Sequence, residues 1–116
     1  MNIEKINHIL EKFVNDRDWK QFHSLKNISA SISIEANELL ELFQWVDNKD
    51  SDTILENKLE KVKEEIADIG IYLLLFCKYG NINLEEVILD KIKKNSEKYP
   101  VSLAKGSSKK YDEFNQ

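Results

Sequence analysis

Turn-forming residues are scarce in this chain. Only three glycines and one proline occur among its 116 residues, although these two residue types mark most turns and loops. A fold of many short strands needs many turns, so the composition favours long helices joined by few loops. The chain is 41% hydrophobic, which is enough to build a core at a length typical of one domain. We expect a single domain over residues 1–116.

Apolar residues recur every three to four positions in four segments, which is the spacing of amphipathic helices. Ser24 or Asn27 is a candidate N-cap for the second helix and Asn83 for the fourth, while Gly80 and Pro100 are candidate stops. The helices are expected over about residues 3–15, 24–46, 53–79 and 84–99. The pattern predicts an all-α four-helix bundle, with an irregular basic tail from Val101 onward.

Several classes of protein are excluded by simple features. Cys77 is the only cysteine, so neither an internal disulfide nor a paired-cysteine zinc site can form. The longest stretch without a charged residue, residues 69–77, is too short to span a bilayer. Glu4 lies near the start and no long apolar segment follows, so we expect no secretory signal. The expected location is the cytoplasm, with no membrane partner.

Charge is distributed unevenly along the chain. Residues 1–90 contain ten basic and 18 acidic residues, whereas residues 91–110 contain seven lysines and one glutamate. An acidic body with a basic segment suits the joint binding of a cation and a polyanion. A solvated helix face followed by a basic tail is the alternative. Nucleic acid is not an expected partner, because the chain as a whole is acidic.

Acidic residues fall where apolar residues belong on two of the expected helices. Glu35 lies within the stripe formed by Ile28, Ile32 and Leu39, and Glu38 lies one turn further along at its edge. A carboxylate on a core-facing stripe is costly to bury unless it is neutralised.

The third expected helix repeats this arrangement. Glu65 borders the arc of Val62 and Ile69, and Asp68 follows at the same spacing of three residues. If the two helices pack antiparallel, the two acidic pairs converge. Such oxygen ligands suit Mg²⁺, with Mn²⁺ as a possible substitute. Exposed, salt-bridged acids are the alternative interpretation.

Other polar and aromatic residues allow two interpretations each. Trp19 and Trp45 suit stacking on a nucleobase but also ordinary packing. Tyr72 lies one turn after Asp68 and either contacts a ligand or covers the core. His23 lies in an expected loop, where a surface histidine is the plain alternative, and Asn95 continues the apolar stripe of the fourth helix.

Six short segments together carry a resemblance to a known family. The sequence resembles the MazG-like, all-α nucleoside triphosphate pyrophosphohydrolases, most closely their dCTP pyrophosphatase branch, over nearly the whole chain. A Glu-x-x-Glu pair alone is weak evidence, but its combination with the other segments is specific. The segments are Arg17–His23, Glu35–Leu39, Phe43–Trp45, Glu65–Asp68, Lys98–Pro100 and Ser107–Tyr111.

The resemblance implies an enzyme that hydrolyses a nucleoside triphosphate to the monophosphate and pyrophosphate. It implies that Glu35, Glu38, Glu65 and Asp68 hold Mg²⁺ and that one glutamate is the general base. It also implies a homo-oligomer, as a tetramer or dimer, with pockets shared between subunits. The substrate-binding residues that it implies are Trp19, His23, Trp45, Tyr72, Asn95, Lys98, Lys109, Lys110 and Tyr111.

One position departs from the family pattern. Leu10 stands nine residues before Trp19, where related enzymes carry a histidine. The expected substrate is dCTP or a modified cytosine deoxynucleotide, in a house-cleaning role for the nucleotide pool, but this departure leaves the base preference open. The same chemistry on dUTP or a damaged purine nucleotide is one alternative. A non-catalytic helical oligomer that binds a partner is the other.

Overall fold

The computed structural model of the chain describes residues 1–114, which contain helices and turns but no strand. The chain forms two compact units, Met1–Asn81 and a second that begins at Ile82. The predicted all-helical fold is confirmed. The single domain expected over residues 1–116 stays a prediction. No helix in the described part of the chain is both long and apolar enough to cross a membrane.

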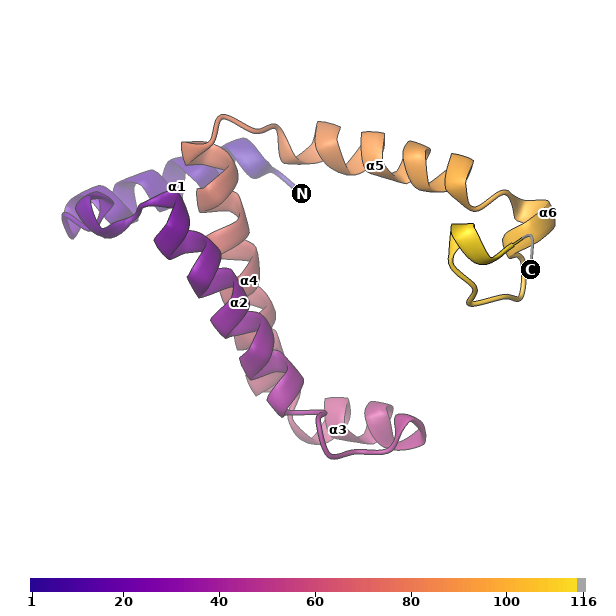
Figure 1. Ribbon diagram of the computed structural model, residues 1–116. Coiled ribbons are helices and arrows are strands. Elements are labelled where there is room, and N and C mark those ends of the chain that lie inside the picture. Colours follow the sequence, from indigo (N-terminus) through magenta and orange to yellow (C-terminus); the bar gives the residue numbers. More distant parts are fainter. Residues whose placement is uncertain (115–116) are drawn as a thin grey trace. The chain divides into compact units, whose positions relative to one another are not determined.

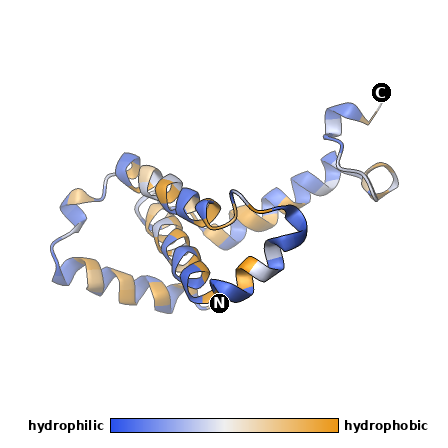
Figure 2. Ribbon diagram, turned by 90° about the horizontal axis from the view of Figure 1, so that it is seen from below, coloured by the Kyte–Doolittle hydropathy of each residue, from blue (hydrophilic) through white to orange (hydrophobic). Residues whose placement is uncertain are grey.

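The first unit is built on three long helices (Figure 1). They are α1 (Ile3–Asp16), α2 (Leu25–Glu41) and α4 (Leu59–Tyr79). The helices α2 and α4 lie side by side and run in opposite directions, and α1 packs against α4. Each long helix carries both hydrophobic and hydrophilic residues along its length (Figure 2), as expected of amphipathic helices.

Local capping explains where these helices begin. The side chain of Asn2 accepts a hydrogen bond from the N–H of Lys5 at 3.0 Å, and that of Ser24 accepts one from Asn27 at 3.1 Å. Each bond satisfies one of the N–H groups that the first helical turn leaves free. Ser24, rather than Asn27, is therefore the N-cap of α2.

The predicted third helix, residues 53–79, is two helices in the structure. The short α3 (Ser51–Asn57) ends at Lys58, whose backbone leaves the helical conformation, and α4 begins at Leu59. Asn57 lies directly before the break, and asparagine is a weak helix former because its side chain competes for backbone hydrogen bonds. A 3₁₀ turn, η2 (Asn48–Asp50), precedes α3.

The second helix is predicted to extend to Val46, but in the structure it ends five residues earlier. The structure ends α2 at Glu41, and residues 42–46 form turns instead of a further helical turn. Bonds between the N–H of Phe43 and Leu40 O at 2.9 Å, and between the N–H of Val46 and Phe43 O at 3.2 Å, tighten this segment. Aromatic and β-branched residues lose side-chain freedom in a helix, which disfavours its continuation here.

Gly80 is the C-cap of α4, and the left-handed backbone conformation is found at the next residue, Asn81, with φ of 53°.

The core of the first unit lies where the three long helices meet. The fully or nearly buried apolar side chains are Leu10 and Val14 on α1, Ile28 on α2, and Val62, Leu74, Leu75 and Cys77 on α4.

The second unit contains α5 (Leu84–Lys98), the short α6 (Val101–Ala104) and a 3₁₀ turn, η3 (Tyr111–Glu113). Asn83 caps α5 by accepting a hydrogen bond from the N–H of Glu86 at 3.1 Å, and Pro100 follows the end of α5. The segment from Val101, predicted to be irregular, is thus partly helical.

Candidate metal centre and ligand pocket

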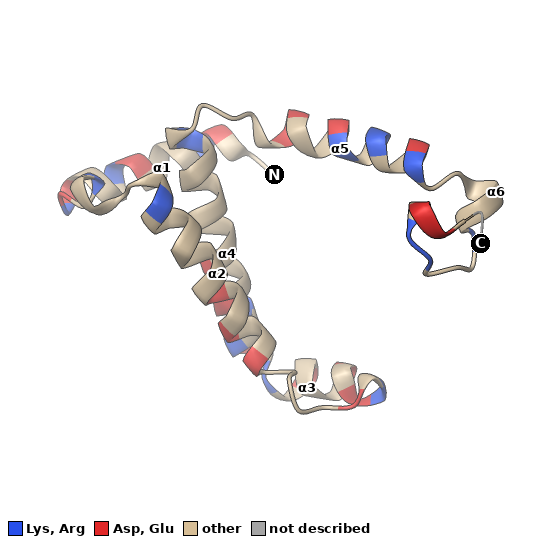
Figure 3. Cartoon of the chain, viewed as in Figure 1, with Lys and Arg blue, Asp and Glu red and all other residues tan. Residues whose placement is uncertain are grey.

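Three carboxylates meet between α2 and α4. One oxygen each from Glu35, Glu38 and Glu65 lies within 4.8 Å of the other two. Glu35 and Glu38 are one turn apart on α2, and Glu65 lies on α4, so the pairing of the two helices assembles the group. Figure 3 shows acidic residues gathered along these two helices. We call Glu35, Glu38 and Glu65 the acidic cluster.

Burial makes the acidic cluster unusual. Glu65 is only 2% exposed, although it is charged. Glu35 Oε2 and Glu65 Oε2 are both buried without a hydrogen-bond partner. Buried polar atoms are normally paired, because an unpaired one loses its interactions with water and gains nothing in return. Free carboxylate oxygens close together have the chemistry of a site for a hard divalent cation, so this set of side chains fits a metal ion.

The pKa values of the cluster respond to this crowding in opposite directions. Loss of solvation, the adjacent carboxyl groups of Glu38 and Glu65, and the negative charges of Glu38 and Asp68 raise the pKa of Glu35 from 4.5 to about 7. The ion pair with Lys61 lowers the pKa of Glu65. Below about pH 7, a proton on Glu35 therefore offsets part of the negative charge of the cluster when no cation is bound.

Asp68 lies at the edge of the acidic cluster. It is close enough to raise the pKa of Glu35, but its carboxylate is not among the three mutually close groups. It lines instead a neighbouring cavity of about 290 Å³. The structure thus brings together three of the four predicted metal ligands and places the fourth between the acidic cluster and the cavity.

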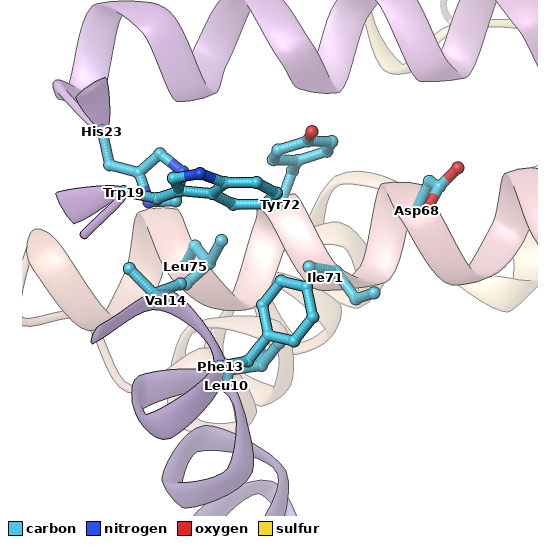
Figure 4. Close-up of a pocket in the computed structure, with 9 residues that line it drawn as sticks. All are labelled: Leu10, Phe13, Val14, Trp19, His23, Asp68, Ile71, Tyr72 and Leu75. Carbon is cyan, nitrogen blue, oxygen red and sulfur yellow. The ribbon is translucent and has the colours of Figure 1, made fainter. Parts of the chain in front are cut away.

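The cavity between α1, α4 and the loop before α2 is mostly apolar. In Figure 4, His23 lies at one end of the cavity and Asp68 at the other, with Trp19 and Tyr72 between them. We call this cavity the aromatic pocket. Its remaining lining residues are Leu10, Phe13, Val14, Ile71 and Leu75.

Two contacts orient the aromatic residues at the pocket. Trp19 packs edge-on against Phe13, with ring centroids 5.7 Å apart. His23 Nδ1 lies 3.3 Å from the hydroxyl oxygen of Tyr79, near the end of α4. Burial raises the pKa of Tyr79, with a further contribution from Glu11, so the hydroxyl keeps its proton and can share a hydrogen bond with His23 Nδ1.

The other predicted substrate-binding residues lie outside this pocket lining. Trp45 is 88% exposed on the turns after α2. In the second unit, Lys98 Nζ lies 5.0 Å from the centroid of the Tyr111 ring, and the N–H of Lys110 donates to Glu113 Oε2 at 3.2 Å. Asn95 is on α5, and Lys109 donates its backbone N–H to Ser107 Oγ at 3.2 Å.

Sequence reasoning missed two residues that contact this region. Lys61 pairs with Glu65 at the helical spacing of four residues, a signal that was readable in the sequence. Tyr79 reaches His23 across 56 positions of chain, and no local pattern predicts such a contact.

The fold and these two features define a class of all-helical proteins with a carboxylate cluster beside a mostly apolar pocket. The profile of the MazG-like family matches residues 30–114, and this chain belongs to that family. The predicted family is therefore confirmed.

Known relatives agree with this membership. The chain is 34% identical to dCTP pyrophosphatase 1 of Bos taurus over 114 residues, which are 97% of this chain and 68% of the relative. It is likewise 34% identical to dCTP pyrophosphatase 1 of Homo sapiens, covering 67% of that protein. The crystal structure of a pyrophosphatase from Archaeoglobus fulgidus superposes with a TM-score of 0.83 at 42% identity, covering 86% of this chain and 94% of that one. These relatives confirm the predicted enzyme class, a nucleoside triphosphate pyrophosphohydrolase.

Proposed function

We propose that this protein is a Mg²⁺-dependent enzyme that converts dCTP, or a modified cytosine deoxynucleotide, to the monophosphate and pyrophosphate. The observation that carries the proposal is the position of Asp68, between the buried acidic cluster and the aromatic pocket. An enzyme of this kind needs a cation at the phosphates of its substrate and an apolar pocket for the base. The cation site and the base pocket must therefore adjoin.

In this proposal Glu35, Glu38, Glu65 and Asp68 hold Mg²⁺, which when bound offsets phosphate charge and makes a bound water more acidic. The two unpartnered oxygens, Glu35 Oε2 and Glu65 Oε2, support this role. One glutamate of the cluster accepts a proton from the attacking water. No protein nucleophile is required, in keeping with the buried position of Cys77.

The aromatic pocket is proposed to hold the base. Trp19 and Tyr72 offer ring faces for stacking, which holds a base without selecting one strongly. His23 offers a ring nitrogen for a hydrogen bond, and Leu10 lines the same cavity as an apolar residue. The relatives named dCTP pyrophosphatase 1 support cytosine as the base.

The proposal extends to residues of the second unit and to assembly. Trp45, Asn95, Lys98, Lys109, Lys110 and Tyr111 are proposed to contact the substrate, the lysines at its phosphates. The protein is further proposed to act as a homo-oligomer, either a tetramer or a dimer, in the cytoplasm and as a house-cleaning enzyme for the nucleotide pool.

The test is product analysis with dCTP, dUTP, dATP and dGTP, each with Mg²⁺ and with EDTA. We expect dCMP and pyrophosphate from dCTP only when Mg²⁺ is present. Pyrophosphate from a different nucleotide would keep the chemistry and reject the base preference. Absence of turnover with every nucleotide would favour a non-catalytic binding protein.

Two isosteric variants test the residues in the same assay. Glu38→Gln and Asp68→Asn each remove one negative charge, and each is expected to lower kcat by about 100-fold or more. Glu41→Gln is the matched control, because Glu41 ends α2 outside the acidic cluster. Full turnover by both variants, with unchanged circular dichroism spectra, would reject the assigned site.

A further inference from the structure

An ion pair lies at one edge of the acidic cluster. Lys61 Nζ lies 3.0 Å from Glu65 Oε1, four residues further along α4. The Glu65 side chain is 3% exposed and that of Lys61 is 57% exposed. The lysine therefore reaches from the surface to a carboxylate that is almost wholly buried. Basic and acidic residues adjoin in this first half of α4 (Figure 3).

The two oxygens of Glu65 have different surroundings. Oε1 is paired with Lys61, whereas Oε2 is buried with no hydrogen-bond partner. An arrangement of this kind neutralises the carboxylate through one oxygen and leaves the other free for a cation.

Lys61 is the only basic side chain that pairs with the acidic cluster in residues 1–114. The other ion pairs of the described chain join Lys12 to Asp16, Lys63 to Glu60 and Lys78 to Glu11. The nearby charges of Glu38 and Glu64 also act on Lys61, so its ammonium group lies in the field of several carboxylates. A buried group of like charges is destabilising unless an opposite charge offsets it.

We propose that Lys61 is the built-in counter-ion of the acidic cluster, which stabilises the metal-free protein and lowers the affinity of the cluster for a divalent cation. The inference rests on the proposed function, in which the cluster binds a cation. Both effects have one cause: a positive charge at Glu65 relieves repulsion among the carboxylates and repels a second positive charge.

An ordinary surface ion pair would have neither effect. Exposed pairs contribute little to stability, because water solvates both partners and salt screens them. Lys63 and Glu60 form such a pair on the same helix, 3.3 Å apart and with both side chains mostly exposed. Lys63 is therefore a matched control for Lys61.

The experiment compares Lys61→Met, Lys61→Arg and Lys63→Met with the wild-type protein. Thermal unfolding is followed in EDTA and in saturating MnCl₂, and Mn²⁺ affinity is measured by the loss of the free-ion electron paramagnetic resonance signal. In EDTA we expect Lys61→Met to lower Tm by about 4 °C or more, with the other two variants within about 2 °C of wild type.

The Mn²⁺ data test the second effect. We expect Lys61→Met to bind Mn²⁺ about threefold or more tightly than wild type, the size expected for two charges several ångströms apart in a water-like medium. By thermodynamic linkage, its Tm deficit must then shrink in MnCl₂.

The experiment distinguishes a failure of the Lys61 inference from a failure of the proposed metal site. Equal Tm shifts for Lys61→Met and Lys63→Met in EDTA, or unchanged or weaker Mn²⁺ binding by Lys61→Met, would overturn the inference alone. A Lys61→Arg variant that behaves like Lys61→Met would do the same, because arginine keeps the charge. Absence of Mn²⁺ binding by the wild-type protein would overturn the proposed metal site and, with it, the effect of Lys61 on affinity.

Discussion

At the residue scale, Glu35 and Glu65 respond oppositely to the same crowding because only one of them has a basic partner. Glu65 is paired with Lys61 and its pKa falls, while Glu35 loses solvation and faces other acids, so its pKa rises to about 7. The proton on Glu35 and a divalent cation are thus alternative ways of neutralising the acidic cluster.

The stability of the metal-free protein is expected to depend on pH through Glu35. Its pKa is raised by folding from 4.5 to about 7, so the folded state binds more protons than the unfolded chain in this window and stability falls as pH rises through it. Glu65, whose pKa is lowered, contributes stability above its usual pKa and loses it only at more acidic pH.

This dependence is checked by measuring Tm in EDTA between pH 5 and pH 8. We expect Tm to fall as pH rises toward about 7 in the wild-type protein and to change less in Glu35→Gln, which cannot ionise. Mn²⁺ affinity of the wild type is expected to rise over the same window, because the cation displaces the proton. Equal slopes for wild type and Glu35→Gln would contradict the assignment.

Tyr79 is expected to act on the substrate through His23. Tyr79→Phe removes the hydroxyl that lies 3.3 Å from His23 Nδ1, so His23 is free to change its tautomer or orientation. A lost hydrogen bond of this kind predicts a rise in KM of about 3- to 10-fold with kcat nearly unchanged.

A double-mutant cycle provides the control for this prediction. Because Tyr79 is argued to act only through His23, adding Tyr79→Phe to His23→Gln should cause little further change in KM. A full additional loss in the double variant would show that Tyr79 acts by another route.

At the scale of elements, helix ends decide which residues the site can use. Glu35 and Glu38 lie inside α2, so their relative positions are set by helical geometry. Trp45 lies beyond Glu41, where α2 ends, and is therefore placed by turns and not by the helix. The helix break at Lys58 means that α4 begins at Leu59. Lys61 and Glu65 therefore lie within the same helix, and helical geometry sets their relative positions.

The N-cap of α2 is expected to contribute measurably to stability. Ser24→Ala removes the acceptor of the 3.1 Å hydrogen bond from the N–H of Asn27, and such a loss costs about 1 kcal/mol. Ser33→Ala, at an exposed position within α2, is the control and should leave stability equal or slightly higher. Urea denaturation measures both, and equal effects would reject the capping role.

At the scale of the whole molecule, large apolar side chains remain exposed in both units. In the described chain they include Ile34, Leu40 and Ile66 in the first unit, and Ile88, Leu89 and Ile92 in the second. Exposed apolar area of this extent is typical of surfaces that associate, and it supports the proposed homo-oligomer.

Sedimentation velocity tests this assembly directly. We expect a species larger than the monomer at micromolar concentration, and we expect Ile92→Lys on α5 to reduce the larger species, because a buried unpaired charge is costly. Lys94→Glu, also on α5, is a control for a general effect of charge. A monomeric wild-type protein would contradict the proposal.

The all-helical class, the approximate starts of α1, α2 and α5, and the unusual positions of Glu35 and Glu65 were readable from the sequence alone. Glu35 and Glu65 were recognisable because helical periodicity is local: residues three and four positions apart share a face whatever the rest of the chain does. The family resemblance, which rested on short motifs, was readable for the same reason.

The contacts between residues far apart in the sequence depend on how the helices pack. The approach of Glu35 and Glu38 to Glu65, the contact of His23 with Tyr79, and the cavity that Leu10 shares with Tyr72 each depend on how α1, α2 and α4 pack. That packing is set by burial of side chains such as Ile28 and Leu75. Hydrophobic burial is non-directional, so the periodicity of one helix predicts which face is buried but not the register at which it meets another.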